Sequence, residues 1–473
     1  MTARLLTRRG EFDQAIEACA RAEALTRDLG DERARVLAVM ESADVCLRRG
    51  AFDDARRRLE TALARAESSA DLGAQARALA SLATVARELG DFPAALGYLE
   101  RSGLICRRMG DVRGAARVLA NQGNVHLNRG EWAEARRCFE PALRSFRALG
   151  AREYEATVLN NMTVALSAGG DYEAASRVAA ECLSLRRELG DQWAVAGILD
   201  NLGVLQHRRG RSPEARRLLG DSVRLRRELG DQPGLVDSLL SLALVERSLG
   251  DRARAADHAR AALAASPEGA ETIAVARGLL ALCGGIEGEA AKREAALGLR
   301  AAARLAGDRG DAELEAIRAL PAGELLADLA DWAALESLGR EQVELASAHH
   351  MLYEEAWARW CLARAALALG RRDEGLAEAR AALALAAESD LRGAHRRISD
   401  GLAERCGDQA PRLWCDAVAS LERYLEAFAP DERAAYLERG GVGARLAGWL
   451  ERARAVKDAP AIGALEAALE RLR

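Results

Sequence analysis

Small and turn-forming residues recur along this chain every 40 residues, with helical stretches predicted between them. Five places after each landmark glycine stands an alanine, and twelve places after it stands another small residue. Seven residues are two helical turns, so both positions lie on one stripe of a helix and let a neighbouring helix approach closely. A further small residue precedes the glycine by seven places, as at Gly123 and Gly203. Each unit is therefore predicted to be two helices that cross at small residues. The landmark glycines are Gly10, Gly50, Gly90, Gly130, Gly170, Gly210 and Gly250.

A second set of glycines lies half a period away, and most of them precede an aspartate. Glycine adopts the left-handed conformation that ends one helix, and aspartate accepts the free amide hydrogens at the start of the next. The pattern predicts helix, tight turn, helix, tight turn. This set is Gly30, Gly110, Gly150, Gly190, Gly230 and Gly310.

These residues resemble the tetratricopeptide repeat. The segments "ILDNLGVLQHRRGRSPEARRLLGDSVRLRRELGD" (198–231) and "VLANQGNVHLNRGEWAEARRCFEPAL" (118–143) carry its asparagine, small residue, glycine turn and two alanines. The period of 40 exceeds the 34 of the basic repeat and is similar to the longer form of GoLoco-motif polarity adaptors, kinesin light chains and bacterial signalling proteins. The resemblance implies an all-α, right-handed superhelical solenoid of about ten antiparallel helix pairs, with first helices lining a concave groove.

The regularity of the repeats predicts three regions. Residues 1–269 hold regular repeats, of which the first is truncated, and residues 270–405 hold degenerate ones. Residues 406–473 lose the pattern and are expected to form a helical cap, since the last repeat of a solenoid has no neighbour to cover its apolar side. Five of the chain's nineteen aromatic residues lie in this tail: Trp414, Tyr424, Phe428, Tyr436 and Trp449.

The first predicted helix is short, since Met1 stands only nine residues before Gly10. Two explanations are open: a shortened cap, or the carboxy-terminal portion of a longer protein with an effector domain upstream.

Composition narrows the classes of function. The chain has 66 arginines and two lysines, but a net charge of only -4, which argues against the one-sided basic field of a nucleic-acid-binding protein. Nine scattered cysteines without a Cys-x-x-Cys pair are typical of buried small residues in a reducing compartment. With no signal peptide and no membrane-length apolar run, we expect a cytoplasmic protein with no membrane partner.

Motifs of catalysis are missing from the sequence. It has no phosphate-binding loop, no Gly-x-Ser-x-Gly elbow and no His-Glu-x-x-His helix. His349 and His350 are adjacent, so on a helix their side chains point about 100 degrees apart and do not predict a metal site. We expect no cofactor, no metal and no enzymatic activity.

A row of polar residues is the best candidate for a binding site. Asn121, Asn161 and Asn201 recur at 40-residue spacing on successive first helices, and an amide offers both a donor and an acceptor to the backbone of an extended peptide. "NQGNV" (121–125) is similar to the asparagine ladder of the O-linked GlcNAc transferase superhelix. The alternative is structural, with each asparagine bonded to the turn beside it. The full predicted groove is Asn121, Asn124, Asn128, Asn160, Asn161, Asp200, Asn201, His207 and Arg208.

The sequence therefore predicts a scaffold that binds a protein or peptide in a concave groove. The alternative is that the array is the sensor or regulatory region of a larger bacterial signal-transduction protein, either a Ser/Thr kinase or an ATPase-linked transcription regulator. The partner, the pathway and the oligomeric state do not follow from the sequence.

Overall fold

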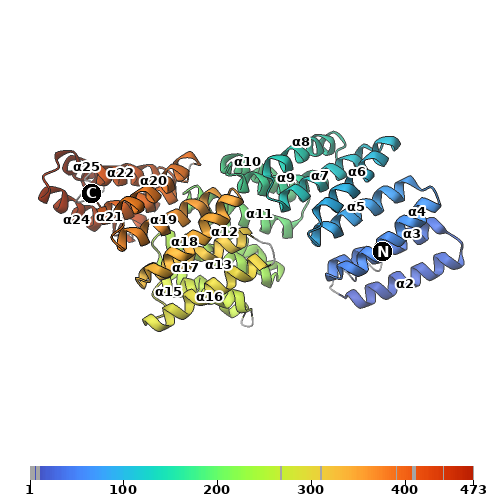
Figure 1. Ribbon diagram of the computed structural model, residues 1–473, viewed down its shortest axis with the longest axis horizontal. Coiled ribbons are helices and arrows are strands. Elements are labelled where there is room, and N and C mark those ends of the chain that lie inside the picture. Colours follow the sequence, from blue (N-terminus) through green and yellow to red (C-terminus); the bar gives the residue numbers. More distant parts are fainter. Residues whose placement is uncertain are drawn as a thin grey trace. The chain divides into compact units, whose positions relative to one another are not determined.

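The chain is described by a computed structural model that covers Leu6 and residues 11–266, 269–308, 312–389, 391–406, 412–439 and 441–471, without the side chains of 312–314. Within these residues the secondary structure consists of 24 helices joined by short turns (Figure 1). The predicted all-α solenoid of antiparallel helix pairs is thereby confirmed. Gly10 and Gly310 lie outside the described residues.

The chain forms two compact units, Met1–Ala165 and Leu166–Arg473, here called the amino-terminal and carboxy-terminal units. The boundary between these units, after Ala165, lies within the regular repeats of residues 1–269. It therefore differs from the boundary at residue 269, where the repeats become degenerate. The helices that begin in the amino-terminal unit are α2 (Phe12–Asp28), α3 (Glu32–Arg49), α4 (Phe52–Ser68), α5 (Leu72–Glu88), α6 (Phe92–Met109), α7 (Val112–Asn128), α8 (Trp132–Ala148) and α9 (Arg152–Ala168).

The carboxy-terminal unit continues the same alternation of first and second helices, and its first helices are the odd-numbered ones from α11 to α21. Its helices are α10 (Tyr172–Glu188), α11 (Gln192–Arg208), α12 (Ser212–Leu229), α13 (Gln232–Ser248), α14 (Arg252–Ala265), α15 (Ala270–Leu282), α16 (Glu289–Asp308), α17 (Ala312–Asp328), α18 (Trp332–Ala348), α19 (Leu352–Ala368), α20 (Arg372–Glu388), α21 (Arg392–Cys406), α22 (Arg412–Leu425), α23 (Pro430–Arg439), α24 (Val442–Ala455) and α25 (Ala459–Arg471).

Glycine and aspartate define the helix boundaries as predicted. Gly50 ends α3 with a φ of 80°, and Gly230 ends α12 with a φ of 71°, in the left-handed region that favours glycine. The carboxylates of Asp31 and Asp191 accept hydrogen bonds from the backbone N–H three residues on, at 3.0 and 3.1 Å. These caps satisfy donors that have no partner within the helix.

Small residues allow the two helices of a repeat to cross at close range. A methyl group on Gly123 of α7 would lie 2.5 Å from the ring of Phe139 on α8, and one on Gly203 of α11 would lie 2.7 Å from Leu219 on α12. Ala135, in the same crossing as Phe139, is fully buried. The predicted crossing at small residues is thus confirmed. A larger residue here would push the helices apart.

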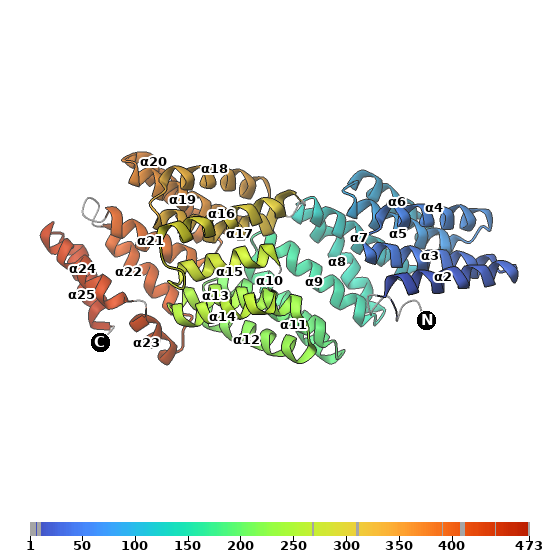
Figure 2. The ribbon, with the colours of Figure 1, turned by 90° about the horizontal axis from the view of Figure 1, so that it is seen from below.

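Successive first helices of the carboxy-terminal unit lie beside one another. Helix α13 contacts α15, and α15 contacts α17, so the three form neighbouring rows (Figure 2). The series then returns on itself, because α11 contacts α21, which lies 200 residues further along the chain. At this contact a methyl group on Gly210 would lie 2.8 Å from the backbone nitrogen of Gly393. The concave side of this unit is therefore enclosed by its own first helices.

The described part of the tail, predicted to be a cap, is helical from α22 to α25 and packs against repeats from the middle of the sequence. The ring centres of Tyr424, Phe428 and Tyr436 lie 5.1–5.6 Å from one another. The three rings belong to one apolar core with Leu219 of α12. The hydroxyl groups of Tyr424 and Ser212 lie 3.2 Å apart in the same place. The cap therefore covers repeats from the middle of the sequence as well as the last one.

The contact between α11 and α21 predicts a difference between two glycines that share one backbone conformation. Replacing Gly230 with alanine should cost about 1 kcal/mol of the free energy of unfolding, from the left-handed turn alone, because nothing lies within 4 Å of the added methyl group. Gly210→Ala should cost about 2 kcal/mol or more, since it adds a clash with α21. Urea unfolding of both variants measures this, and equal losses would contradict the close approach.

Candidate functional site

The predicted asparagine row is a bonded ladder in the amino-terminal unit. The amide of Asn161 on α9 donates a hydrogen bond of 2.8 Å to the side-chain oxygen of Asn124 on α7, and Asn160 donates one of 3.4 Å to Asn161. Asn128 accepts a hydrogen bond of 3.3 Å from Arg87, and Asn121 is half-buried on the same helix. The side chains therefore tie neighbouring first helices together, and each bonded amide keeps further donor or acceptor capacity.

In the carboxy-terminal unit, Asp200 joins three helices. Its carboxylate accepts a hydrogen bond of 2.7 Å from Ser238 of α13 and forms an ion pair with Arg226 of α12. Burial raises the pKa of Asp200, although the hydrogen bond from Ser238 and the charge of Arg226 oppose this effect. Asn201, the next residue on α11, is exposed. Asp200 therefore bonds to neighbouring helices, whereas the side chain of Asn201 faces solvent.

His207 and Arg208 lie at the carboxyl end of α11 and line a cavity of about 300 Å³. We call this the central cavity. It is formed mainly by the first helices α11, α13, α15, α17, α19 and α21, with α12 adding Leu219. Most of the wall is apolar, and its apolar side chains include Val204, Leu240, Leu244, Val275, Ile317, Leu320, Pro321 and Trp357.

Arg208 holds two distant helices together at this cavity. Its guanidinium lies 2.7 Å from the carboxylate of Glu354 on α19, and both side chains are almost completely buried. The same guanidinium lies 5.7 Å from the centre of the Tyr353 ring, within the range of a cation–π interaction. Because a buried pair loses its hydration, breaking it leaves an uncompensated charge in the interior. Arg208 is therefore firmly held in place.

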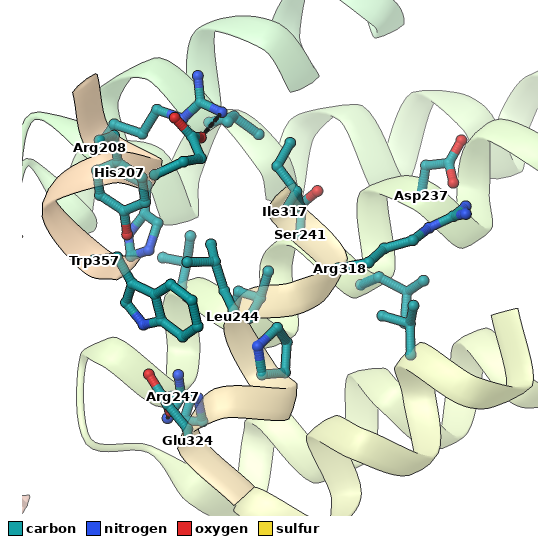
Figure 3. A pocket seen from close by; sticks show the side chains of 18 of the residues that line it. His207, Arg208, Asp237, Ser241, Leu244, Arg247, Ile317, Arg318, Glu324 and Trp357 are labelled. Atoms are coloured by element: carbon teal, nitrogen blue, oxygen red, sulfur yellow. Dashed lines mark hydrogen bonds and ion pairs between the residues drawn. The ribbon is translucent and has the colours of Figure 1, made fainter. Parts of the chain in front are cut away.

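Charged groups lie at separate places on the wall of the central cavity (Figure 3). Arg247 and Glu324 form an ion pair near Trp357, and Arg397 lies 3.7 Å from Glu324. Burial alone would raise the pKa of Glu324, but the charges of Arg247 and Arg397 outweigh it and lower the pKa. Asp237 is exposed on another side of the cavity. A ligand with both apolar and polar groups would find partners for each.

His207 is held neutral among cations. Burial, together with the charges of Arg397, Arg247 and Arg208, lowers the pKa of its imidazole to about 3. Its Nδ1 lies 3.3 Å from the hydroxyl of Ser212. At neutral pH the ring therefore contributes an uncharged polar surface to the wall.

The asparagine positions and the cavity wall share one register. Ser241 lines the central cavity, and Asn201 and Asn161 stand 40 and 80 residues before it. The asparagine row and the cavity wall thus lie on the same face of the first helices, but the row does not extend to Asp237, Ser241 and Leu244 because the asparagines end at Asn201. Extending the 40-residue spacing by one repeat would have found Ser241. Nothing local marks Glu324, Trp357 or Arg397, which lie in less regular repeats.

Neither a metal site nor a membrane-spanning helix is found in the part of the chain that the structure describes. No group of three or more His, Cys, Asp or Glu side chains there is arranged to hold a metal ion. No helix among those residues combines the length and the apolar character needed to cross a membrane.

Stacked helix pairs of constant length, closed by glycine turns and crossed at small residues, define a helical repeat protein. Two sequence profiles, both described as tetratricopeptide repeat, match residues 35–102, 114–188 and 194–268 and residues 356–388. Together they cover more than half of the chain. The chain therefore belongs to the tetratricopeptide repeat family.

Solved structures share this fold at low sequence identity. The apo form of RapI is 13% identical, covering 78% of this chain and 97% of its own, with a TM-score of 0.51. A Rap protein complexed with competence and sporulation factor is 15% identical over 79% and 97% of the two chains, with a TM-score of 0.47. BtubC (BKLC) from P. vanneervenii is 21% identical over 46% and 92%, with a TM-score of 0.43. No curated protein matches the sequence significantly.

The ladder predicts that its asparagines differ in their effect on stability. Asn161→Ala should lower the free energy of unfolding by about 1 kcal/mol, because it removes a partly buried hydrogen bond and leaves Asn124 with one partner fewer. Asn201→Ala, at an exposed position of the same register, should change it by less than about 0.5 kcal/mol. Urea unfolding measures both, and similar losses would show that the ladder bond is not stabilising.

The environment of His207 predicts a loss of stability in acid. Its folded-state pKa lies below the ordinary value of 6.5, so the unfolded chain takes up a proton first as the pH falls. The stability that neutral His207 confers is present above pH 6.5 and is lost below it, by about 2 kcal/mol at pH 5. Urea unfolding at pH 7 and pH 5 should show this loss in the wild type and a smaller one in His207→Gln. A matched variant at an exposed histidine, His350→Gln, should behave as the wild type.

Proposed function

We propose that the chain is a non-catalytic scaffold that binds an extended peptide or protein segment on the concave face of its first helices. The central cavity of the carboxy-terminal unit is its principal site. The observation that supports this most is that six first helices contribute to a single, mainly apolar cavity with charged groups at separate places. Repeat proteins use concave surfaces of this kind to bind their partners.

The size of the cavity favours part of a peptide over a folded domain. Its volume of about 300 Å³ lies near the lower end of the range for ligand pockets, roughly 300–1,000 Å³. Such a space accommodates a few side chains of a bound segment. Apolar side chains would pack against Leu244 and Trp357, while Asp237 and Ser241 offer polar contacts to the backbone or to a basic group.

The chemistry of the wall favours binding over catalysis. The carboxylates of Glu324 and Glu354 are both engaged by arginines, and the lowered pKa of Glu324 makes it a poor base. Burial and the surrounding arginines keep His207 unprotonated. Burial also raises the pKa of the Cys361 thiol on α19, which makes that thiol a weak nucleophile. Charged groups that are fixed in pairs are well suited to a surface that selects its ligand by shape and charge.

A variant that fills the cavity tests the proposal. Peptides selected from a displayed random library on the purified wild-type chain should lose at least tenfold in affinity for Ser241→Trp, since the indole would occupy space that the peptide needs. Fluorescence anisotropy with labelled peptides measures the affinity.

Leu305→Trp is the control, because it places the same side chain at an exposed position on a second helix, and it should bind as the wild type does. Thermal unfolding checks that both variants are folded. Unchanged affinity in Ser241→Trp would place binding elsewhere, and a library that yields no peptide would contradict the proposal.

A further inference from the structure

A second cavity, of about 520 Å³, adjoins the central cavity and shares Arg247, Glu324, Tyr353, Trp357 and Arg397 with it. It extends toward α21 and α24 of the cap. Seven arginines and four acidic residues line it, together with Trp360. We call it the arginine chamber.

Its carboxylates are shared between more arginines than they can neutralise. Glu324 pairs with both Arg247 and Arg397. Asp400 lies 3.2 Å from Arg396 and 3.3 Å from Arg445. Two negative charges thus face four guanidinium groups, each of which stays protonated at any physiological pH.

A third carboxylate, Glu404, is engaged outside the chamber. It accepts a hydrogen bond of 2.6 Å from the indole of Trp449 and lies 3.5 Å from Arg452, and neither of these residues lines the chamber. The fourth acidic residue, Asp328, is exposed, as is Arg252. These two offset each other in charge, and the other six arginines of the chamber outnumber its other three carboxylates.

Two further arginines line the chamber: Arg364, which is half-buried, and Arg405, which is exposed at its edge. Among the contacts described, neither forms an ion pair with a carboxylate, and the Nε of Arg364 is buried without a hydrogen-bond partner. The guanidinium of Arg405 lies 5.9 Å from the centre of the Trp360 ring. Its Nη1 donates a hydrogen bond of 3.3 Å to the backbone carbonyl of Gly401. Burial lowers the pKa of Arg405, and the nearby charge of Arg364 lowers it further. Two like charges are therefore held together beside an aromatic wall.

An arrangement of this kind has a definite ligand chemistry. Guanidinium groups bind carboxylate and phosphate oxygens through paired, charge-assisted hydrogen bonds. A buried donor without a partner costs free energy that such an oxygen would recover. The ligand chemistry that suits the chamber is that of an oxyanion group.

We propose that the arginine chamber binds an acidic group of the peptide whose apolar side chains occupy the central cavity, with Arg364 and Arg405 as its principal ligands. This inference rests on the proposed function, because the two cavities adjoin and share five wall residues, so that one extended ligand could contact both. Aspartate or glutamate side chains, a terminal carboxylate and a phosphorylated side chain all present the required oxygens. The chamber thus selects acidic segments among the peptides that the concave face admits.

The test compares peptides selected on the full-length wild type with those selected on the double variant Arg364→Gln/Arg405→Gln. The wild type should enrich acidic residues over the starting library, and the double variant should not. Replacing each Glu by Gln in a wild-type-selected peptide should weaken binding about tenfold. The same replacement should have little effect on binding to the double variant. Separate arms with a phosphorylated peptide and with an amidated carboxyl terminus identify which oxyanion is bound.

A matched control removes two exposed arginines of the same unit, Arg177→Gln/Arg187→Gln on α10. It should keep the acidic preference. The double variant at Arg364 and Arg405 should also unfold at the same temperature as the ligand-free wild type or higher, since it relieves repulsion between like charges. A structural role for the two arginines would instead lower that temperature.

Each outcome decides between the two proposals. Peptides that bind the central cavity without any acidic preference would overturn this inference and leave the proposed function intact. If no peptide is selected, both fail. In that case inorganic pyrophosphate and citrate serve as probes, and thermal stabilisation of the wild type but not of the double variant would show that the chamber takes a free anion in place of a peptide.

Discussion

The carboxy-terminal unit depends on a contact between helices that are far apart in sequence. The turn after α11 approaches the start of α21 so closely that only hydrogen atoms fit on Gly210, and the buried pair of Arg208 and Glu354 joins α11 to α19 in the same region. The steric contact and the ion pair act together, because the pair is only compensated when the two helices are in place. Without this closure the first helices would line an open surface. With it they enclose a cavity whose walls come from repeats at both ends of the unit.

Enclosure changes the chemistry of the residues that face inward. Arginines on repeat surfaces are ordinarily solvated, and several of those on the second helices here, such as Arg57, Arg137 and Arg177, are exposed and lie beside an acidic residue one turn away. Among the first helices of this unit the same residue type is crowded around Glu324 and Asp400. Burial, together with the charges of Arg397, Arg247 and Arg208, keeps His207 neutral. A protein with a net charge of -4 can therefore contain a cavity lined by more arginines than carboxylates. Net charge describes the whole chain, whereas recognition depends on the local arrangement of charges.

The asparagine ladder illustrates how far sequence reasoning reached. Residues 40 apart occupy the same register in successive regular repeats, and Ser241 at the register of the asparagines lines the central cavity. Sequence reasoning left two roles open for the asparagines, and the hydrogen bond between Asn161 and Asn124 shows that at least these two contribute to packing. Asp200 was grouped with them, yet its contacts with Arg226 and Ser238 are with neighbouring helices. The position of a residue in the repeat specifies the face of the helix on which it lies, and the neighbouring residues determine which contacts its side chain makes.

The sequence by itself determined the helices, their ends and the family. Glycine turns, aspartate caps and small crossing residues act over a few residues, or between adjacent helices, so a repeating pattern specifies them fully. Only the tertiary structure decided that α11 meets α21, that the cap reaches back to α12 and that seven arginines gather in one chamber. The position of a distant helix results from small rotations that accumulate over many repeats. No single residue encodes that sum, so the enclosed site became visible only once the helices were placed in space.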